Sequence, residues 1–353
     1  MNKVINLTVL VLCLFLASCG NKSEKDIETK MESGVVLIQN ESFYEIELSN
    51  GETLYFTSYD EENGITGIAT ELDSVEVETS YGTGFFISEN GEIATNAHVV
   101  SNTAEEKDMT RSMSKVLEAL KQILVVAYQE YTEKYNQAAR YCEFAYYSDE
   151  VSAADFYALR DIRDAIAQQL QEFSDIYDVL DDIDASQSTI TYHNNVSIAY
   201  NNTHVTSSTD FTDCVVTKVD ADHDLAILQL KDKKTPEDKY IFSVEDDDPF
   251  ETYSLFEKIG TDKNSKLFMM GFNLGPSLAV TKEGIKAQFN SGTVSQQTSE
   301  HLMYSIPSLP GSSGSPVVNM KGQLVAINFA GLQNTQSFNY GIRVKYLKQL
   351  MEK

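Results

Sequence analysis

The stretch PGSSGSPVVN, Pro310–Asn319, changes abruptly from small and hydroxyl-bearing residues to apolar ones. Such a pattern predicts a tight turn that leads directly into a strand. It also suits the presentation of a serine nucleophile, because glycines let backbone N–H groups turn toward a reacting oxygen. A serine hydroxyl needs a base, and a third group to orient that base, so the rest of the chain decides between the two interpretations.

A candidate base and a candidate acid occur in two strand-like segments upstream. Of the five histidines, His98 lies in the apolar stretch IATNAHVV, at the end of a predicted strand. Asp224 immediately precedes the alternating run LAILQL, whereas its competitor Asp222 lies two residues further away, so we favour Asp224. The order His98, Asp224, Ser313 is one that base, acid and nucleophile follow in a known type of hydrolase.

Five segments, GTGFFIS, GEIATNAHVV, DHDLAILQL, SGTVSQ and PGSSGSPVVNMKGQLVAINFAG, occur in this order. They resemble the bacterial trypsin-like serine peptidases of the Deg/HtrA and glutamyl-endopeptidase kinds. The resemblance implies a mainly β, chymotrypsin-like double β-barrel with the active site between two six-stranded barrels. It implies that His98 is the general base, Asp224 its orienting acid and Ser313 the nucleophile. The N–H groups of Gly311 and Ser313 would form the oxyanion hole, and the reaction would need neither cofactor nor metal.

The same resemblance places the substrate-binding residues on two segments. The segment AINFAG is similar to the strand that pairs with substrate and walls the primary pocket, which gives Asn328, Phe329 and Ala330 as lining residues. Pro307 lies six residues before the nucleophile, in a segment without a carboxylate. We therefore expect a small to medium apolar residue before the cleaved bond, and not Arg or Lys.

The pattern of residues also divides the chain. Short alternating runs joined by Asn-Gly turns predict strands near the start and in the last third. In the middle, without glycine or proline, apolar residues recur at steps of three and four in two successive runs, which predicts an antiparallel helical hairpin. We expect the first barrel over 34–103 and 187–248, the hairpin insertion over 104–186, and the second barrel with a final helix over 249–353.

Two further expectations follow from this division. The insertion begins six residues after His98, so we expect its base near the active-site cleft, where it would restrict access or dock a substrate. Only 40 residues follow Ser313, and the barrel and the final helix account for them, so no PDZ domain is expected after the peptidase.

The N-terminus, MNKVINLTVLVLCLFLASCG, contains an early lysine, an apolar run and small residues before a cysteine. An apolar run this short is typical of an export signal and not of a permanent membrane span. Its end resembles the lipobox of bacterial lipoproteins, which implies removal of residues 1–18, a lipid on Cys19 and a tether over 19–33. We expect a lipid-anchored protein of the bacterial cell envelope, on its periplasmic or outer-surface face, whose only membrane contact is that lipid.

Charge and cysteines limit the remaining choices. A net charge of −26 without a basic patch excludes nucleic acid as a partner, because phosphate binding needs clustered Lys and Arg. Cys142 and Cys214 form either a disulfide or two separately buried thiols.

The expected function is a serine endopeptidase that acts on proteins or peptides, and the oligomeric state stays open. The alternative is a latent peptidase-fold binding or sensing module whose helical hairpin engages a partner protein.

Overall fold

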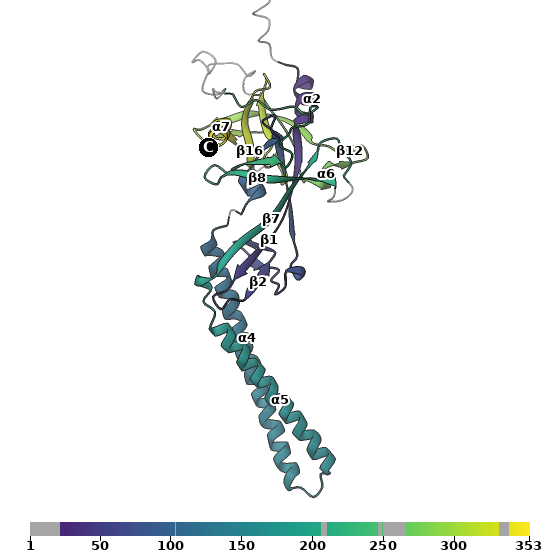
Figure 1. Ribbon diagram of the computed structural model, residues 1–353, viewed down its shortest axis with the longest axis vertical. Helices are drawn as coiled ribbons and strands as arrows, with labels where there is room; N and C mark the ends of the chain where they lie inside the picture. Colours follow the sequence, from purple (N-terminus) through teal and green to yellow (C-terminus); the bar gives the residue numbers. More distant parts are fainter. Residues whose placement is uncertain (1–21, 103, 206–209, 246–248, 250–265, 332–338) are drawn as a thin grey trace, which may run out of the picture. The chain divides into compact units, whose positions relative to one another are not determined.

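The computed structural model describes residues 22–353 apart from 103, 206–209, 246–248, 250–265 and 332–338 (Figure 1). Cys19, the expected lipid attachment site, therefore lies outside the described residues. The chain forms two compact units. The barrel unit comprises the residues up to Ser42, Glu78–Thr103 and Asn194–Lys353, and the hairpin unit comprises Phe43–Val77 and Ala104–His193.

Six strands close the first barrel in the order β1-β5-β6-β9-β8-β7, with a β1–β7 pairing that completes the ring. Their bounds are β1 Val35–Glu47, β5 Glu78–Phe86, β6 Glu92–Thr95, β7 Thr189–Tyr200, β8 Thr212–Asp220 and β9 Leu225–Leu230. In β9, Leu225 and Ile227 join one apolar cluster, and Ala226 and Leu228 join another. Successive side chains of a strand point to opposite faces, so β9 is buried on both.

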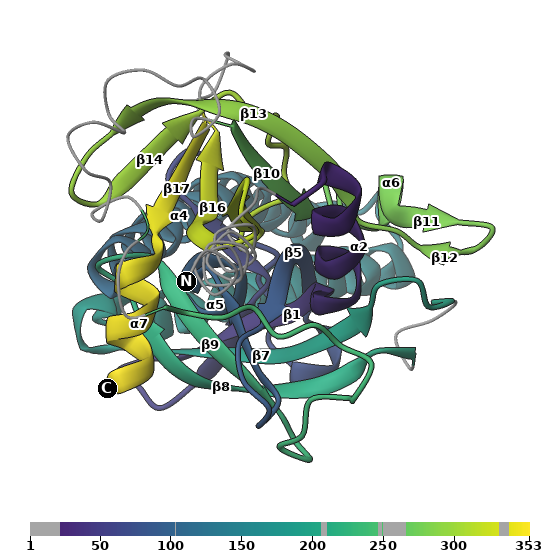
Figure 2. The same cartoon turned by 90° about the horizontal axis from the view of Figure 1, so that it is seen from above.

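The second barrel is closed by six strands in the order β10-β13-β14-β17-β16-β15, most of which are labelled in the upper part of Figure 2. Their bounds are β10 Lys266–Gly271, β13 Gln288–Gln297, β14 His301–Tyr304, β15 Pro316–Asn319, β16 Leu324–Gly331 and β17 Asn339–Arg343. One apolar cluster contains Phe85 and Leu225 of the first barrel with Phe268 and Ile342 of the second, so the two barrels share a core. The expected chymotrypsin-like double barrel with a helical insertion is confirmed.

Short elements complete the barrel unit. They are α2 Glu24–Gly34, α3 Ala97–Val100, α6 Pro276–Ala279, β11 Val280–Thr281, β12 Gly284–Ile285 and α7 Val344–Glu352. Helix α2 occupies much of the segment 19–33 that we expected to be a tether. Its Ile27 and Met31, one turn apart, are each only 2% exposed and belong to the shared core. This part of the expected tether is therefore folded structure. The sequence did not indicate it, because only two apolar residues stand among many polar ones.

The hairpin unit contains the two expected helices, α4 Glu106–Tyr147 and α5 Ala153–Asp181, which lie antiparallel (Figure 1). The hydroxyl of Ser152 caps α5 by accepting a hydrogen bond from the N–H of Asp155 at 3.2 Å. The unit also holds the strands β2 Thr53–Phe56, β3 Ser58–Asp60 and β4 Gly64–Thr66, and the 3₁₀ turns η2 Leu72–Ser74 and η3 Ala185–Gln187.

Residues 43–77, which we expected in the first barrel, lie in the hairpin unit. Strand β1 pairs with β5 as far as Ser42, and from Tyr44 onward it pairs with β2. Tyr44 and Phe56 then pack with Met113 and Leu117 of α4 in one apolar cluster. The hairpin therefore has a small hydrophobic core of its own at the start of α4.

The structure also bears on the possible disulfide and on membrane-spanning helices. Cys142 and Cys214 are both buried and free, which excludes the disulfide in this structure. Burial raises the pKa of the Cys214 thiol to about 12, so this thiol stays protonated at neutral pH. Within the described ranges, no helix combines the length and apolarity that crossing a membrane requires.

Candidate active site

The candidate base and acid contact one another directly. His98 lies in α3, a single helical turn that follows β6. Its Nδ1 is 2.7 Å from Oδ2 of Asp224. The other carboxylate oxygen, Oδ1, accepts a hydrogen bond from the backbone N–H of His98 at 2.9 Å. Asp222 is exposed and has no such contact. The carboxylate of Asp224 therefore fixes both the ring and the backbone of His98, which leaves Nε2 as the ring atom able to exchange a proton.

The backbone of Asp224 is unusual. Its φ is +50°, in the left-handed region that non-glycine residues seldom adopt. The side-chain amide of Asn96, which is fully buried, donates a hydrogen bond to the carbonyl of Asp224 at 2.9 Å. Such strain persists only where surrounding contacts hold it, and it concentrates at functional sites. Asn96 is thus a residue that we did not identify from the sequence, although it stands two positions before His98.

The Ser313 loop begins with a tight turn. The N–H of Ser312 donates to the carbonyl of Leu309 at 2.9 Å, and Gly311, between them, has a φ of +92°. Pro followed by Gly with a positive φ defines a type II turn. The carbonyl of Pro310 is held by the N–H of Leu274 at 2.6 Å. The N–H of Gly311 belongs to the same planar trans peptide, so it must point away from Leu274.

Two backbone donors of this loop differ from their neighbours. Among the described residues, neither the N–H of Gly311 nor that of Ser313 has a hydrogen-bond partner, whereas those of Ser312, Gly314 and Ser315 do. Two unpaired N–H groups flanking a serine hydroxyl are what an oxyanion hole requires. These are the two donors expected from the sequence.

The hydroxyl of Ser313 is in a resting position. It donates to the carbonyl of Phe329 at 3.4 Å, and across the described part of the chain no hydrogen bond joins it to His98. Catalytic hydrogen bonds are often long or absent before substrate binds. A change of one side-chain torsion moves a serine hydroxyl between its staggered positions.

Thr83 of β5 connects the first barrel to the Ser313 loop. Its hydroxyl donates to the carbonyl of Gly311 at 2.9 Å and accepts from the N–H of Phe272 at 3.0 Å. Its N–H donates to the carbonyl of Ser313 at 2.8 Å, and its carbonyl accepts from the hydroxyl of Thr95 at 2.8 Å. Thr95 stands just before Asn96, so one chain of hydrogen bonds links the segment of His98 to the loop of Ser313. We did not identify Thr83 from the sequence.

Asn328, expected to line the specificity pocket, lies beneath the loop. It is fully buried, and its Oδ1 accepts from the hydroxyl of Tyr304 at 2.8 Å. Its Nδ2 donates to Oγ of Ser308 at 3.0 Å and to the carbonyl of Ser312 at 3.0 Å. Because every polar atom of this amide is occupied within the protein, Asn328 supports the loop and its side chain does not line an open pocket.

The other expected pocket residues differ in position. Pro307 is exposed, and Phe329 is half-buried and stacks on His301 with ring centroids 5.1 Å apart. Ala330 pairs with Tyr340 in the strand register, and its side chain lies outside the described part.

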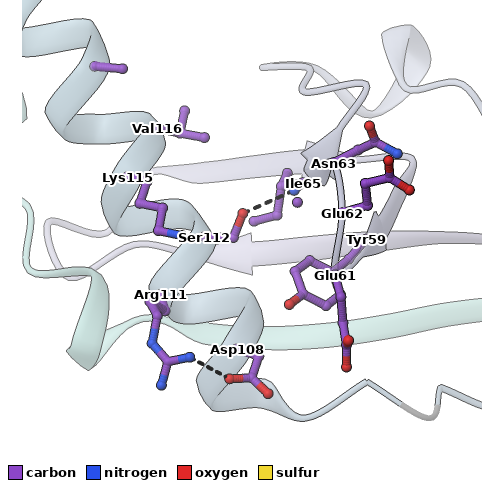
Figure 3. A pocket seen from close by; sticks show the side chains of 12 residues that line it. Tyr59, Glu61, Glu62, Asn63, Ile65, Asp108, Arg111, Ser112, Lys115 and Val116 are labelled. Atoms are coloured by element: carbon purple, nitrogen blue, oxygen red, sulfur yellow. Dashed lines mark hydrogen bonds and ion pairs between the residues drawn. The ribbon is translucent and has the colours of Figure 1, made fainter.

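A separate pocket of about 620 Å³ lies in the hairpin unit, between the β3–β4 segment and α4 (Figure 3). Arg111 pairs with Asp108 at 2.9 Å, and the hydroxyl of Ser112 accepts from the N–H of Ile65 at 3.1 Å. Its lining contains charged and polar side chains but no histidine or cysteine.

The comparison with family models agrees with this architecture. The family model described as a trypsin-like peptidase domain matches residues 178–327, a span that includes Asp224 and Ser313 but begins after His98. The barrel unit has a trypsin-like peptidase fold. No curated protein matches the sequence.

Solved structures with some likeness include two bacterial proteases. A serine endoprotease from Yersinia pestis has 13% identity and a TM-score of 0.43, with 94% of this chain and 66% of that chain covered. A protease from M. tuberculosis in its active form has 11% identity and a TM-score of 0.42, with 93% and 83% covered. This chain thus spans slightly less than two thirds of the length of the Yersinia protein.

Proposed function

We propose that this protein is a serine endopeptidase that hydrolyses peptide bonds through His98, Asp224 and Ser313. The observation that carries the proposal is the Asp224 carboxylate, which binds both the ring and the backbone N–H of His98. Hydrogen bonds through Thr83 and Thr95 connect this pair to a serine loop with two free N–H donors. The peptidase fold of the barrel unit supports the same conclusion.

The proposed reaction is acyl transfer. The hydroxyl of Ser313 attacks the peptide carbonyl, and its proton passes to Nε2 of His98 because Asp224 occupies Nδ1. Asp224 stays ionised and stabilises the imidazolium. The oxygen of the tetrahedral intermediate accepts hydrogen bonds from the N–H groups of Gly311 and Ser313. His98 then gives the proton to the leaving amine, and water, activated by the same base, hydrolyses the acyl-enzyme. All proton transfers use these side chains, so the reaction needs no cofactor.

A second candidate is a latent peptidase-fold module, and one observation favours it. The Ser313 hydroxyl hydrogen-bonds the carbonyl of Phe329 at 3.4 Å and not His98, which describes a resting site. In that case the hairpin unit, and not hydrolysis, would carry the function.

A fluorophosphonate probe distinguishes the two candidates, because it reacts only with an activated serine. The enzyme predicts labelling of the wild type at Ser313, none in Ser313→Ala and strongly slowed labelling in His98→Ala. Cleavage of a peptide library by the wild type, with Ser313→Ala as the control, would give the preferred residue before the bond. A wild type that is never labelled, with or without added peptides, supports the latent module.

We also propose that the protein is anchored in the bacterial cell envelope through a lipid on Cys19, where it meets protein or peptide substrates. The support is the apolar run and the small residues that precede this cysteine. Cys19→Ser should move the protein from the membrane fraction to the soluble fraction. A wild type that already fractionates as soluble contradicts the anchor without affecting the peptidase assignment.

A further inference from the structure

The hairpin unit carries most of the negative charge. Residues 43–77 and 104–193 hold 27 of the 53 acidic residues but only 8 of the 27 basic ones, so the unit has a charge of −19 out of −26. No Lys or Arg occurs between Arg163 and Lys218. Helix α5 thus ends in a sequence without a cation of its own.

Four carboxylates recur at every third residue along the second half of α5: Glu172, Asp175, Asp178 and Asp181. Within the described residues, the one cation paired with this acidic row is Lys121, whose Nζ is 2.9 Å from Asp181. Like charges at this spacing repel one another, and acidic groups in the last turn lie at the negative end of the helix dipole. The row is therefore unfavourable for the isolated hairpin, and a cationic partner would relieve it.

An apolar groove runs along the same part of the hairpin. It has a volume of about 270 Å³ and is lined by Leu124, Val125, Tyr128, Gln129, Phe173, Ser174 and Tyr177. We call this the hairpin groove. Val125 is 41% and Tyr128 is 44% exposed, and α5 contains no buried residue at all. Two helices bury a single seam, so amphipathic helices with wider apolar faces leave the remainder in water.

We propose that the hairpin groove binds a basic amphipathic helix of a partner protein. Its apolar face would cover Val125, Tyr128 and Phe173. Its Lys or Arg side chains would reach Asp178, which lies one helical turn after Ser174 of the groove. Long basic side chains can lay their stems along apolar surface while their charges reach a neighbouring carboxylate. A helix set against two others in this way is a common mode of peptide recognition.

Charge decides between this occupant and two others. A second copy of the hairpin would bring one acidic row against another. Among the described residues, Lys121 is the one cation paired with each row, so the two rows would repel each other. An anionic membrane surface would be repelled by the same carboxylates. A cationic helix is the occupant for which both the apolar groove and its charged border are favourable.

The test uses the full-length protein in a Ser313→Ala background, so that the probe is not cleaved. The probe is a fluorescent 18-residue amphipathic peptide of Leu and Lys, measured by anisotropy at about 0.15 M salt to screen long-range attraction. Val125→Ser with Tyr128→Ser should weaken binding at least tenfold, and Asp178→Asn should weaken it at least threefold without altering the groove. A matching peptide of Leu and Glu should not bind.

The matched controls are Tyr146→Ser with Tyr147→Ser, which removes exposed aromatic residues at the hairpin tip, and Glu61→Gln with Glu62→Gln, which removes two exposed charges elsewhere in the unit. Both should bind the probe within twofold of the parent, and thermal melting should show that every variant is folded. Equal weakening by the controls, or no weakening by the groove variants, overturns the proposal. Two other results would also overturn the proposal: a dimer seen by analytical ultracentrifugation, or binding to anionic phospholipid vesicles. Either result counts only if it is lost when Val125 and Tyr128 are changed.

Discussion

The hydroxyl of Thr83 donates a hydrogen bond to the carbonyl of Gly311 at 2.9 Å, and joins a strand of the first barrel to the Ser313 loop. Thr83 is fully buried, and its own N–H fixes the carbonyl of Ser313 at 2.8 Å. The N–H groups of Gly311 and Ser313, which have no partner among the described residues, lie in this loop. Thr83 therefore positions both proposed oxyanion donors from the neighbouring barrel, without itself being a catalytic residue.

Thr83→Val should reduce kcat toward a small peptide by about 10- to 100-fold with little change in KM, because a misplaced oxyanion donor weakens binding of the transition state alone. It also leaves the N–H of Phe272 unpaired, which should cost about 1–3 kcal/mol of stability. Thr83→Ser keeps the hydroxyl and should restore most of kcat. Equal kcat in the Val and Ser variants would mean that the hydroxyl has only a structural role.

The proposed triad makes a different prediction, on additivity. Ser313→Ala, His98→Ala and Asp224→Ala should each lower kcat/KM by orders of magnitude, and the triple variant should be little worse than Ser313→Ala, because the three groups act as one unit. Steady-state hydrolysis of one peptide by the wild type and the four variants measures this. Losses that multiply from variant to variant would show that the groups act independently, and full activity in Ser313→Ala would exclude this serine.

The sequence predicts the triad because its chemistry depends on rare residue types. With five histidines in the chain, the pairing of His98 with Asp224 is the one that apolar strand neighbours favour, and the structure places these two 2.7 Å apart. Thr83 is different, because threonine is a common strand residue and nothing local shows that its hydroxyl reaches the distant residue Gly311. Long-range hydrogen bonds of this kind leave no periodic signal in a sequence.

Two other discrepancies also have physical reasons. The resemblance of AINFAG to a pocket-lining strand gave Asn328 as a pocket residue, although its side chain holds the loop from beneath. Alternation along β16 does not reveal how deeply a polar residue is buried. Residues 43–77 resembled barrel strands because they alternate, but β2 pairs with the end of β1, and β3 pairs with β4. Tyr44 and Phe56 pack with residues of α4. Which strand a segment pairs with is a matter of tertiary contacts.

Asp220 should make stability depend on pH. It is 6% exposed, and its carboxylate lies 3.1 Å from Nδ1 of His223 and 3.3 Å from Nζ of Lys353. Burial alone would raise its pKa, but the hydrogen bonds from His223 and Lys353 lower the pKa of Asp220 below the ordinary value of 3.8. A lowered pKa stabilises the folded state above pH 3.8, and this contribution disappears as the pH falls through the lower folded value.

Asp220→Asn should therefore reduce the free energy of unfolding by about 1–3 kcal/mol at pH 7. The difference from the wild type should shrink at pH 3. Urea unfolding at the two pH values measures both, and Asp222→Asn, at an exposed position two residues away, is the control. A difference that is as large at pH 3 as at pH 7 would mean that the charge of Asp220 contributes nothing.

The last prediction concerns how much of the hairpin the peptidase needs. Removing residues 104–186 takes Met109, Met113 and Leu117 from the apolar cluster that Tyr44 and Phe56 share with them. Each such loss costs about 2–5 kcal/mol, so this deletion should be strongly destabilised or insoluble. The instability of this variant would come from the damaged apolar cluster. It would not test whether the hairpin restricts access to the active site.

A shorter hairpin avoids that damage. The rings of Tyr131 and Phe173 are 5.2 Å apart, so a four-residue Gly/Ser turn can replace Thr132–Glu172 where the helices already touch. This variant should melt cooperatively within a few degrees of the wild type and cleave small peptides at least as fast. If the hairpin restricts access to the active site, the selectivity of this variant among folded protein substrates should differ from that of the wild type. An unchanged cleavage pattern on folded substrates, in a variant that is stable and active on peptides, would reject gating by the distal hairpin.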